Sequence, residues 1–210
     1  MIIRDELKSQ LTAFGIDCDE ETLAQLDLYA LSVLKFNLSL NLISKNNPER
    51  EIIKQIVDSA AMLRFGDITG RKILDAGSGG GIPGIILKIL TPEIELHSLD
   101  SNPRKIAFQE KACRDLNIVG CNFYDSQISE FKPQIKFDII TCKAFGKFTE
   151  IFRLAQNYLS ADGEIVLYIG EDIPEEIETS IGENFLICAC HSYSLPEDSG
   201  KRQLIVIKKK

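Results

Sequence analysis

The stretch Asp75-Ala-Gly-Ser-Gly-Gly-Gly-Ile-Pro-Gly84 decides the fold predicted for this chain. It directly follows a short apolar run at 73–76 and precedes an apolar run at 82–90 with helical character. Glycine accepts positive φ in a tight turn and lets a ligand approach the backbone closely. A strand, a glycine loop and a helix in this order predict a ligand-binding turn at the carboxyl edge of a parallel sheet.

An acidic residue ends the next predicted strand. Residues 94–99 alternate between apolar and polar side chains and stop at Asp100. A carboxylate at this place can accept hydrogen bonds from both hydroxyls of a ribose. The glycine loop and Asp100 together predict an adenosine-type ligand.

Two adenosine-containing cofactors fit this pattern. Gly79, Gly81 and Gly84 satisfy the G-x-G-x-x-G spacing of nicotinamide enzymes, which is a weak signal on its own. The acid Asp75 before the glycines, the D-x-G-x-G-x-G spacing and a predicted terminal hairpin favour S-adenosylmethionine instead. Dehydrogenases of this fold also usually need a second substrate domain, for which 210 residues leave little room.

The rest of the chain predicts an α/β fold. Apolar residues at helical spacing predict helices through residues 1–65. Beyond the loop, strands are predicted at 137–141, 164–169, 185–190 and 203–207, and helices after Pro103 and at 148–159. Such alternation predicts a parallel sheet covered on both faces, closed by an antiparallel hairpin. We expect one domain over 1–210, with 1–65 as a helical extension of a core at 71–210.

Composition indicates a globular cytosolic protein. Hydrophobic residues make up 44% of the chain and charged residues 26%, and no apolar run approaches the roughly 20 residues that span a bilayer. The N-terminus has no apolar signal core, and the six cysteines include no C-x-x-C pair, which predicts reduced thiols and no metal site. Cys188 and Cys190 share one face of a predicted strand, where core packing is expected.

The net charge of −7 counts against a nucleic-acid substrate, because nucleic-acid binders usually carry a basic surface. Basic residues nevertheless recur locally. They are Arg104 and Lys105, Lys143 and Lys147, Lys201 and Arg202, and the tail 208–210.

Several short motifs, in order, resemble one family over nearly the whole chain. They are Asn41-Leu42-Ile43-Ser44, Asp58-Ser59, Asp75 to Gly84 ending in Ile-Pro-Gly, Leu99-Asp100-Ser101 with Arg104-Lys105, Phe137-Asp138, Lys143-Ala144-Phe145, and Arg202 to Lys208. The chain thereby resembles the bacterial 16S ribosomal RNA guanine-N7 methyltransferase family, also called the glucose-inhibited division protein B family. The resemblance implies a Rossmann-like class I S-adenosylmethionine-dependent methyltransferase fold with a mostly parallel seven-stranded sheet. It implies methylation of N7 of guanine 527 in 16S rRNA, in the 530 loop of the small ribosomal subunit. We also expect a monomer without metal.

The resemblance also implies roles for individual residues. Those implied to contact S-adenosylmethionine are Gly77, Gly79, Ile82, Asp100 at the ribose, Ile128 and Ser129 along the adenine, and Lys143. Lys143 would lie near both cofactor and substrate and is the candidate catalytic residue. Arg104, Lys105 and Arg202 are the candidate RNA-binding residues.

Three positions depart from the family pattern. Gln55 stands where the family typically has histidine, Lys143 where it usually has arginine, and Ile169 where a lysine usually precedes Gly170. A lysine keeps the charge of arginine but lacks its planar, bidentate fork. Two other functions therefore stay open: methylation of a small molecule or protein, and non-catalytic binding of cofactor or RNA.

The chemistry of guanine N7 suits this sequence. N7 already carries a lone pair, so methyl transfer needs positioning more than an acid–base pair. The chain lacks the Asn/Asp-Pro-Pro-Tyr/Phe signature of amino methylation, and His97 lies inside a strand, where packing is expected. Cys142 beside Lys143 allows a covalent mechanism, but the Pro-Cys motif of such enzymes is missing, so a small strand-end residue is the simpler interpretation.

Overall fold

The computed structural model of the protein describes residues 2–143 and 148–210. Ala144, Phe145 and Lys147, which the sequence analysis singled out, lie outside the described residues. Within the described ranges, no helix is both long and apolar enough to cross a membrane.

Seven strands form one sheet in the order β3-β2-β1-β4-β5-β7-β6. The first five strands in this order run parallel, and β7 pairs antiparallel with both β5 and β6. This confirms the mostly parallel sheet and the closing hairpin. The strands are β1 (Lys72–Ala76), β2 (Glu95–Asp100), β3 (Cys121–Asp125), β4 (Phe137–Lys143), β5 (Leu159–Ile169), β6 (Phe185–Leu195) and β7 (Asp198–Lys209).

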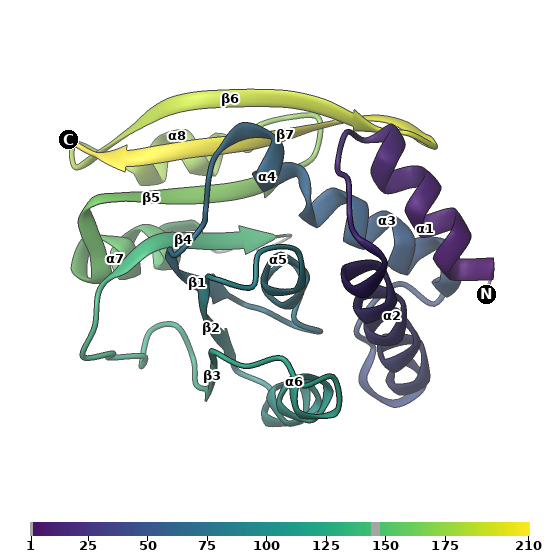
Figure 1. The fold of residues 1–210 in the computed structure, drawn as a ribbon. Helices are drawn as coiled ribbons and strands as arrows, with labels where there is room; N and C mark the ends of the chain where they lie inside the picture. The colour runs from purple at the N-terminus through teal and green to yellow at the C-terminus, as the bar shows by residue number, and fades with distance from the viewer. Residues whose placement is uncertain (1, 144–147) are drawn as a thin grey trace.

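Helices cover the two faces of the sheet, and each face has its own apolar core. One core joins α1 to α6 with side chains such as Ile73 and Val166, and the other joins α7 and α8 with side chains such as Leu74 and Ile165. Figure 1 shows the hairpin at one end of the sheet and β3 with α6 at the other. The helices are α1 (Ile2–Ala13), α2 (Glu20–Leu40), α3 (Pro48–Ser59), α4 (Ala61–Phe65), α5 (Gly84–Leu90), α6 (Pro103–Asp115), α7 (Phe148–Tyr158) and α8 (Glu175–Ile181).

The N-terminal helices share a core with the sheet. Leu26 of α2 and Ile56 of α3 are fully buried in the same cluster as Ile73 of β1. Asp19 caps α2 by accepting a hydrogen bond from the Thr22 N–H at 2.8 Å, which satisfies a free donor of the first turn. Burial of these apolar stripes supports the proposal that residues 1–65 extend the core and do not form a separate module.

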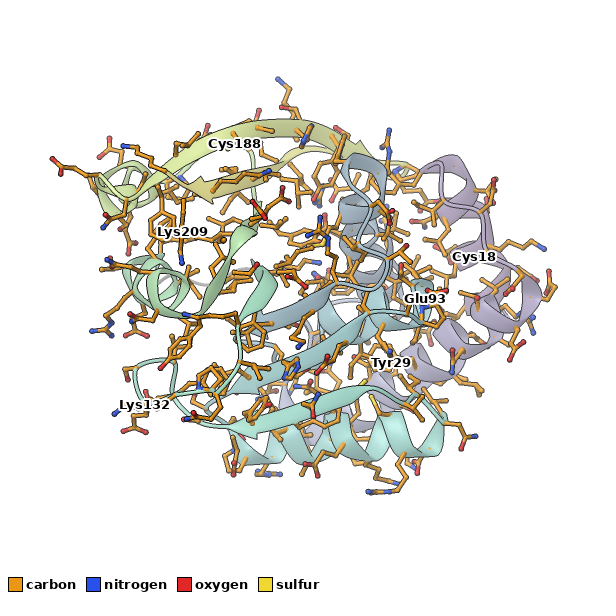
Figure 2. The ribbon with its side chains drawn as sticks, turned by 60° about the vertical axis from the view of Figure 1, so that its left-hand side comes forward. Cys18, Tyr29, Glu93, Lys132, Cys188 and Lys209 are labelled. Atoms are coloured by element: carbon orange, nitrogen blue, oxygen red, sulfur yellow. The ribbon has the colours of Figure 1, made fainter. Side chains whose placement is uncertain are left out.

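Three local features differ from the predictions. Strand β3 and helix α8 were not predicted. Cys188 and Cys190 do not pack in the core; both are exposed on β6. The reason is that burial alternates along β6: Phe185, Tyr193 and Leu195 face the core, whereas Cys188 and Cys190 lie on the opposite, solvent-exposed face of the strand. Figure 2 shows Cys188 on this outer strand.

Candidate active site

The glycine loop turns the chain from β1 over the end of β2. The N–H groups of Gly77 and Ser78 both donate to the Leu99 carbonyl, at 2.8 and 2.9 Å. Gly77, Gly79 and Gly81 have φ of 78°, 56° and 83°, a region that side chains other than glycine rarely adopt. The loop is therefore a backbone surface held open beside the end of β2.

Asp100 anchors this surface. Its Oδ2 accepts from the Gly79 N–H at 2.8 Å, and its Oδ1 accepts from the Asn102 N–H at 2.8 Å. An ionised carboxylate has about four acceptor sites, so two remain for the hydroxyls of a sugar. The carboxylate lines a hollow of about 120 Å³, room for a sugar-sized group.

We call this the Asp100 hollow. Its lining residues are Gly77, Leu99, Asp100, Ser101, Ser126, Gln127, Ile128 and Glu150. Of the predicted cofactor contacts, Gly77, Asp100 and Ile128 line it. Ile82 packs half-buried in the core behind the loop, and Ser129 is exposed beside the hollow. Sequence reasoning missed Glu150, in the first turn of α7, because nothing local links that helix to β2.

The N-terminal helices support the loop from behind. The Tyr29 hydroxyl of α2 donates to the Gly80 carbonyl, and Figure 2 shows Tyr29 in the interior. Leu42 packs so closely on Gly80 that a Cβ there would lie 3.2 Å from the Leu42 Cβ. The buried Asn37 holds Leu42 in place by accepting from its N–H at 2.7 Å. This explains the Asn41-Leu42-Ile43-Ser44 motif, which ends α2 against the glycine loop.

Asp75 is a buried acid below the loop. Its Oδ2 accepts from the Gly84 N–H at 2.8 Å, which joins β1 to the start of α5. Burial is the largest influence and raises the pKa of Asp75 to about 7; the Gly84 N–H opposes this rise, Asp100 adds to it, and Lys143 opposes it. The acid before the glycines is thus a structural brace, since it does not line the Asp100 hollow.

A second hollow, of about 260 Å³, lies on the other side of the β1 end. Its lining residues are Lys54, Gln55, Asp58, Lys143, Tyr168, Ile169, Gly170 and Arg202. All three positions that depart from the family pattern therefore meet at one place, together with the candidate RNA-binding residue Arg202. We call it the Lys143 hollow.

Lys143 ends β4 next to the glycine loop. Asp75 of β1 is in register with Thr141 of β4, so Lys143 ends the strand next to the one that leads into the glycine loop. The Lys143 Nζ lies 2.8 Å from the Asp58 Oδ2, and both side chains are only 10% exposed. Burial lowers the pKa of Lys143, and the contact with Asp58 opposes that fall. Lys143 does not line the Asp100 hollow, so its implied cofactor contact stays a prediction.

A family model described as "GidB: rRNA small subunit methyltransferase G" matches residues 22–205. The chain belongs to this family.

Curated proteins named "Ribosomal RNA small subunit methyltransferase G" are similar over nearly full length. The one from Stutzerimonas stutzeri is 28% identical, covering 98% of this chain and 95% of its own. The one from Laribacter hongkongensis is 31% identical, covering 99% and 92%. The solved structure of ribosomal protein L11 methylase from Lactobacillus delbrueckii subsp. bulgaricus superposes with a TM-score of 0.59 at 15% identity, covering 75% of this chain and 79% of that one. The fold is thus the Rossmann-like class I methyltransferase fold.

The remaining candidate residues of this methyltransferase lie apart from one another. Arg104 and Lys105 start α6, beside β2 and β3, whereas Arg202 lies on β7 at the other end of the sheet. The structure therefore does not bring these three RNA-binding candidates together. Cys142 is buried in the core under α7, which disfavours a covalent mechanism. His97 is packed as predicted, with its Nδ1 3.0 Å from the Tyr124 hydroxyl.

Proposed function

We propose that this protein transfers the methyl group of S-adenosylmethionine to N7 of guanine 527 in the 530 loop of 16S rRNA. One observation carries the proposal: in a member of the rRNA small subunit methyltransferase G family, two hollows of different chemistry lie along one edge of the sheet, the first beyond β1 and β2 and the second beyond β4 and β5. The first suits a nucleoside, and the second holds the cationic side chains.

The Asp100 hollow fits S-adenosylmethionine. The positive-φ glycines leave the loop backbone bare, and the Asp100 carboxylate keeps acceptor capacity for ribose hydroxyls. Ile128 offers an apolar surface for an adenine ring. When bound, the cofactor supplies an electrophilic methyl group.

The Lys143 hollow fits a guanine nucleotide that has left its RNA stack. Lys143 and Arg202 can contact phosphate or base oxygens, and Tyr168 lies in the same wall. Guanine N7 needs no deprotonation before it attacks a methyl group, so these side chains have to orient the base and exclude water. The buried, hydrogen-bonded set of groups around Asp58 is suited to that task, because it is fixed in place.

Mass spectrometry of 16S rRNA tests the proposal. Cells that carry the gene should contain N7-methylguanine at position 527, cells that lack it should not, and a plasmid copy should restore it. Equal methylation with and without the gene would exclude this activity. Methylation that is lost from another substrate instead would favour a small-molecule or protein methyltransferase on the same fold.

A further inference from the structure

Asp58 is a buried carboxylate that contacts side chains from three strands. It lies near the end of α3, and the residue as a whole is buried. Its Oδ2 is 2.8 Å from the Lys143 Nζ of β4, and its Oδ1 accepts from the Tyr193 hydroxyl of β6 at 2.8 Å. The Arg202 Nε of β7 lies 3.5 Å from the same Oδ1. A single carboxylate thus ties the carboxyl end of β4 to the terminal hairpin.

The position of Asp58 is fixed by its neighbours on α3. The apolar residues of that helix are buried in the core, and Ser59 is fully buried directly after Asp58. The Tyr168 hydroxyl donates to the Ser59 carbonyl at 2.7 Å, which anchors the helix end to β5. A carboxylate on such a rigid support holds its partner side chains in one place.

Lys143 depends on this carboxylate for its direction. Its ammonium also donates to the Gln55 carbonyl at 3.4 Å and lies 5.7 Å from the centre of the Tyr168 ring. An ammonium has three N–H donors, and partners among the described residues occupy two of them. The third is left for a group inside the Lys143 hollow.

We propose that Asp58 is a positioning residue, whose buried carboxylate binds the Lys143 ammonium and aims it into the hollow where the substrate base binds. This inference rests on the proposed function, because it assigns to Lys143 a contact with that substrate. Asp58 itself acts through Lys143, since both of its oxygens are occupied by protein groups.

The charges around Lys143 predict opposite effects for two substitutions. Burial lowers the pKa of Lys143 most, Asp58 and more weakly Glu51 of α3 raise it, and Arg202 of β7 lowers it. From β1, the carboxyl of Asp75 also interacts with Lys143. The hydroxyls of Tyr168 on β5 and Tyr193 on β6 have raised pKa values, the first through burial above all, so they stay neutral. Asp58 is therefore the main group that keeps the ammonium charged.

The titration of Lys143 by NMR tests the proposal. In protein labelled with ¹³C-lysine, the Lys143 Cε signal is assigned by its loss in Lys143→Met and followed with pH. Asp58→Asn should lower the pKa of Lys143 by about one to two pH units, and Arg202→Gln should raise it. Glu51→Gln is the matched control, because it removes a carboxylate of the same helix that acts on Lys143 only weakly, and it should lower this pKa much less than Asp58→Asn does.

Single-turnover methylation of small ribosomal subunits gives the second readout. As the pH rises, the rate of Asp58→Asn should fall at a lower pH than the rate of the wild type. The difference in pH should equal the shift in the Lys143 pKa seen by NMR. In a Lys143→Met background, Asp58→Asn should cause no further loss of rate. An unchanged Lys143 pKa in folded Asp58→Asn would overturn the proposal. So would a loss of rate from Asp58→Asn that is as large in the Lys143→Met background as in the wild type.

Two further outcomes, a variant that does not fold and a wild type without activity, also give a clear answer. If Asp58→Asn does not fold, Arg202→Gln decides alone: a raised pKa of Lys143 supports the shared carboxylate, and an unchanged one contradicts it. If the wild-type protein methylates no rRNA, the proposed function fails, whereas the NMR titration still decides whether Asp58 holds Lys143.

Discussion

The two hollows at the end of the sheet are built in different ways. The Asp100 hollow is mainly backbone: a loop of positive-φ glycines, fixed by hydrogen bonds to Leu99 and Asp100 that lie within 23 residues of it along the chain. The Lys143 hollow is built of charged side chains from α3, β4 and β7, which meet only in the folded protein. The backbone hollow can be recognised from a short motif, and its partner cannot. The difference also means that single substitutions should damage the two hollows in different ways.

The largest effect expected concerns Asp75, the buried acid below the glycine loop. Burial raises the pKa of Asp75 to about 7 in the folded protein. Between about pH 4 and 7 the folded state therefore holds a proton that the unfolded chain has released, so this group lowers stability as the pH rises. Asp75→Asn should remove that dependence. The difference in free energy of unfolding, variant minus wild type, should therefore increase by up to about 4 kcal/mol between pH 4 and pH 7.

Urea unfolding of both proteins at several pH values measures this difference. Asp75→Asn keeps an oxygen that can accept from the Gly84 N–H, so the comparison isolates the charge. A difference between variant and wild type that stays constant with pH would show that Asp75 is not the buried acid described here.

Next in size is the loss of Lys143 from the side-chain hollow. Lys143→Met keeps most of the apolar stem but removes the ammonium, and methylation of small subunits in single turnover should fall by about 100- to 1,000-fold. Stability should fall as well, because Asp58 loses a partner for its buried charge. Calorimetry of this variant tests the cofactor contact that the resemblance implies for Lys143: because Lys143 does not line the Asp100 hollow, we expect nearly unchanged affinity for S-adenosylmethionine, which would argue against that contact.

Lys54→Met is the matched control for this variant. Lys54 lines the same hollow, but its side chain is 38% exposed and pairs with Asp198 at 2.9 Å. We expect a loss of less than about tenfold, because an exposed ion pair contributes little. Equal losses in the two variants would mean that the hollow needs positive charge in general and not Lys143.

A smaller effect is expected from Gly84, a closely packed glycine at the end of the glycine loop. In Gly84→Ala, the new Cβ would lie 2.7 Å from the Asp75 Oδ2 and 2.9 Å from the Leu96 Cδ1. Because both neighbours are buried, we expect a loss of about 3 kcal/mol in the free energy of unfolding.

Gly70→Ala gives the reference for Gly84→Ala in the same unfolding assay. Gly70 has φ of 69°, but a Cβ there would meet no atom within 4 Å. Its substitution reports backbone strain alone and should cost about 1–2 kcal/mol. A Gly84→Ala protein as stable as the wild type would contradict the close packing of Asp75 against α5.

The smallest effect concerns Asp100 and the cofactor. Asp100→Ala removes the ribose acceptor and the partner of the Gly79 N–H, and binding of S-adenosylmethionine should weaken by about 1–3 kcal/mol. Calorimetry measures the change, with Asp125→Ala as control at the end of the neighbouring strand β3. Equal affinities in wild type and Asp100→Ala would show that the cofactor does not bind in this hollow.

The sequence predicted the backbone part of this structure better than the side-chain part. Local patterns were sufficient for the strand, loop and helix around Asp75 and for the acid at Asp100, because turn geometry and periodicity act over a few residues. Strand β3 was missed because its half-exposed residues 121–125 lack a clear apolar alternation. The meeting of Asp58, Lys143 and Arg202 spans 145 positions of the chain and depends on sheet order, so no local signal indicated it.

The central claim is that the Asp100 hollow binds the cofactor and the Lys143 hollow orients the substrate. Single-turnover methylation of small ribosomal subunits, measured for Asp100→Ala and Lys143→Met over a range of S-adenosylmethionine concentrations, tests it most directly. The account predicts that saturating cofactor restores most of the rate in Asp100→Ala and none of the lost rate in Lys143→Met. Restoration of the Lys143→Met rate by cofactor, or a deficit in Asp100→Ala that cofactor cannot relieve, would contradict this division of roles.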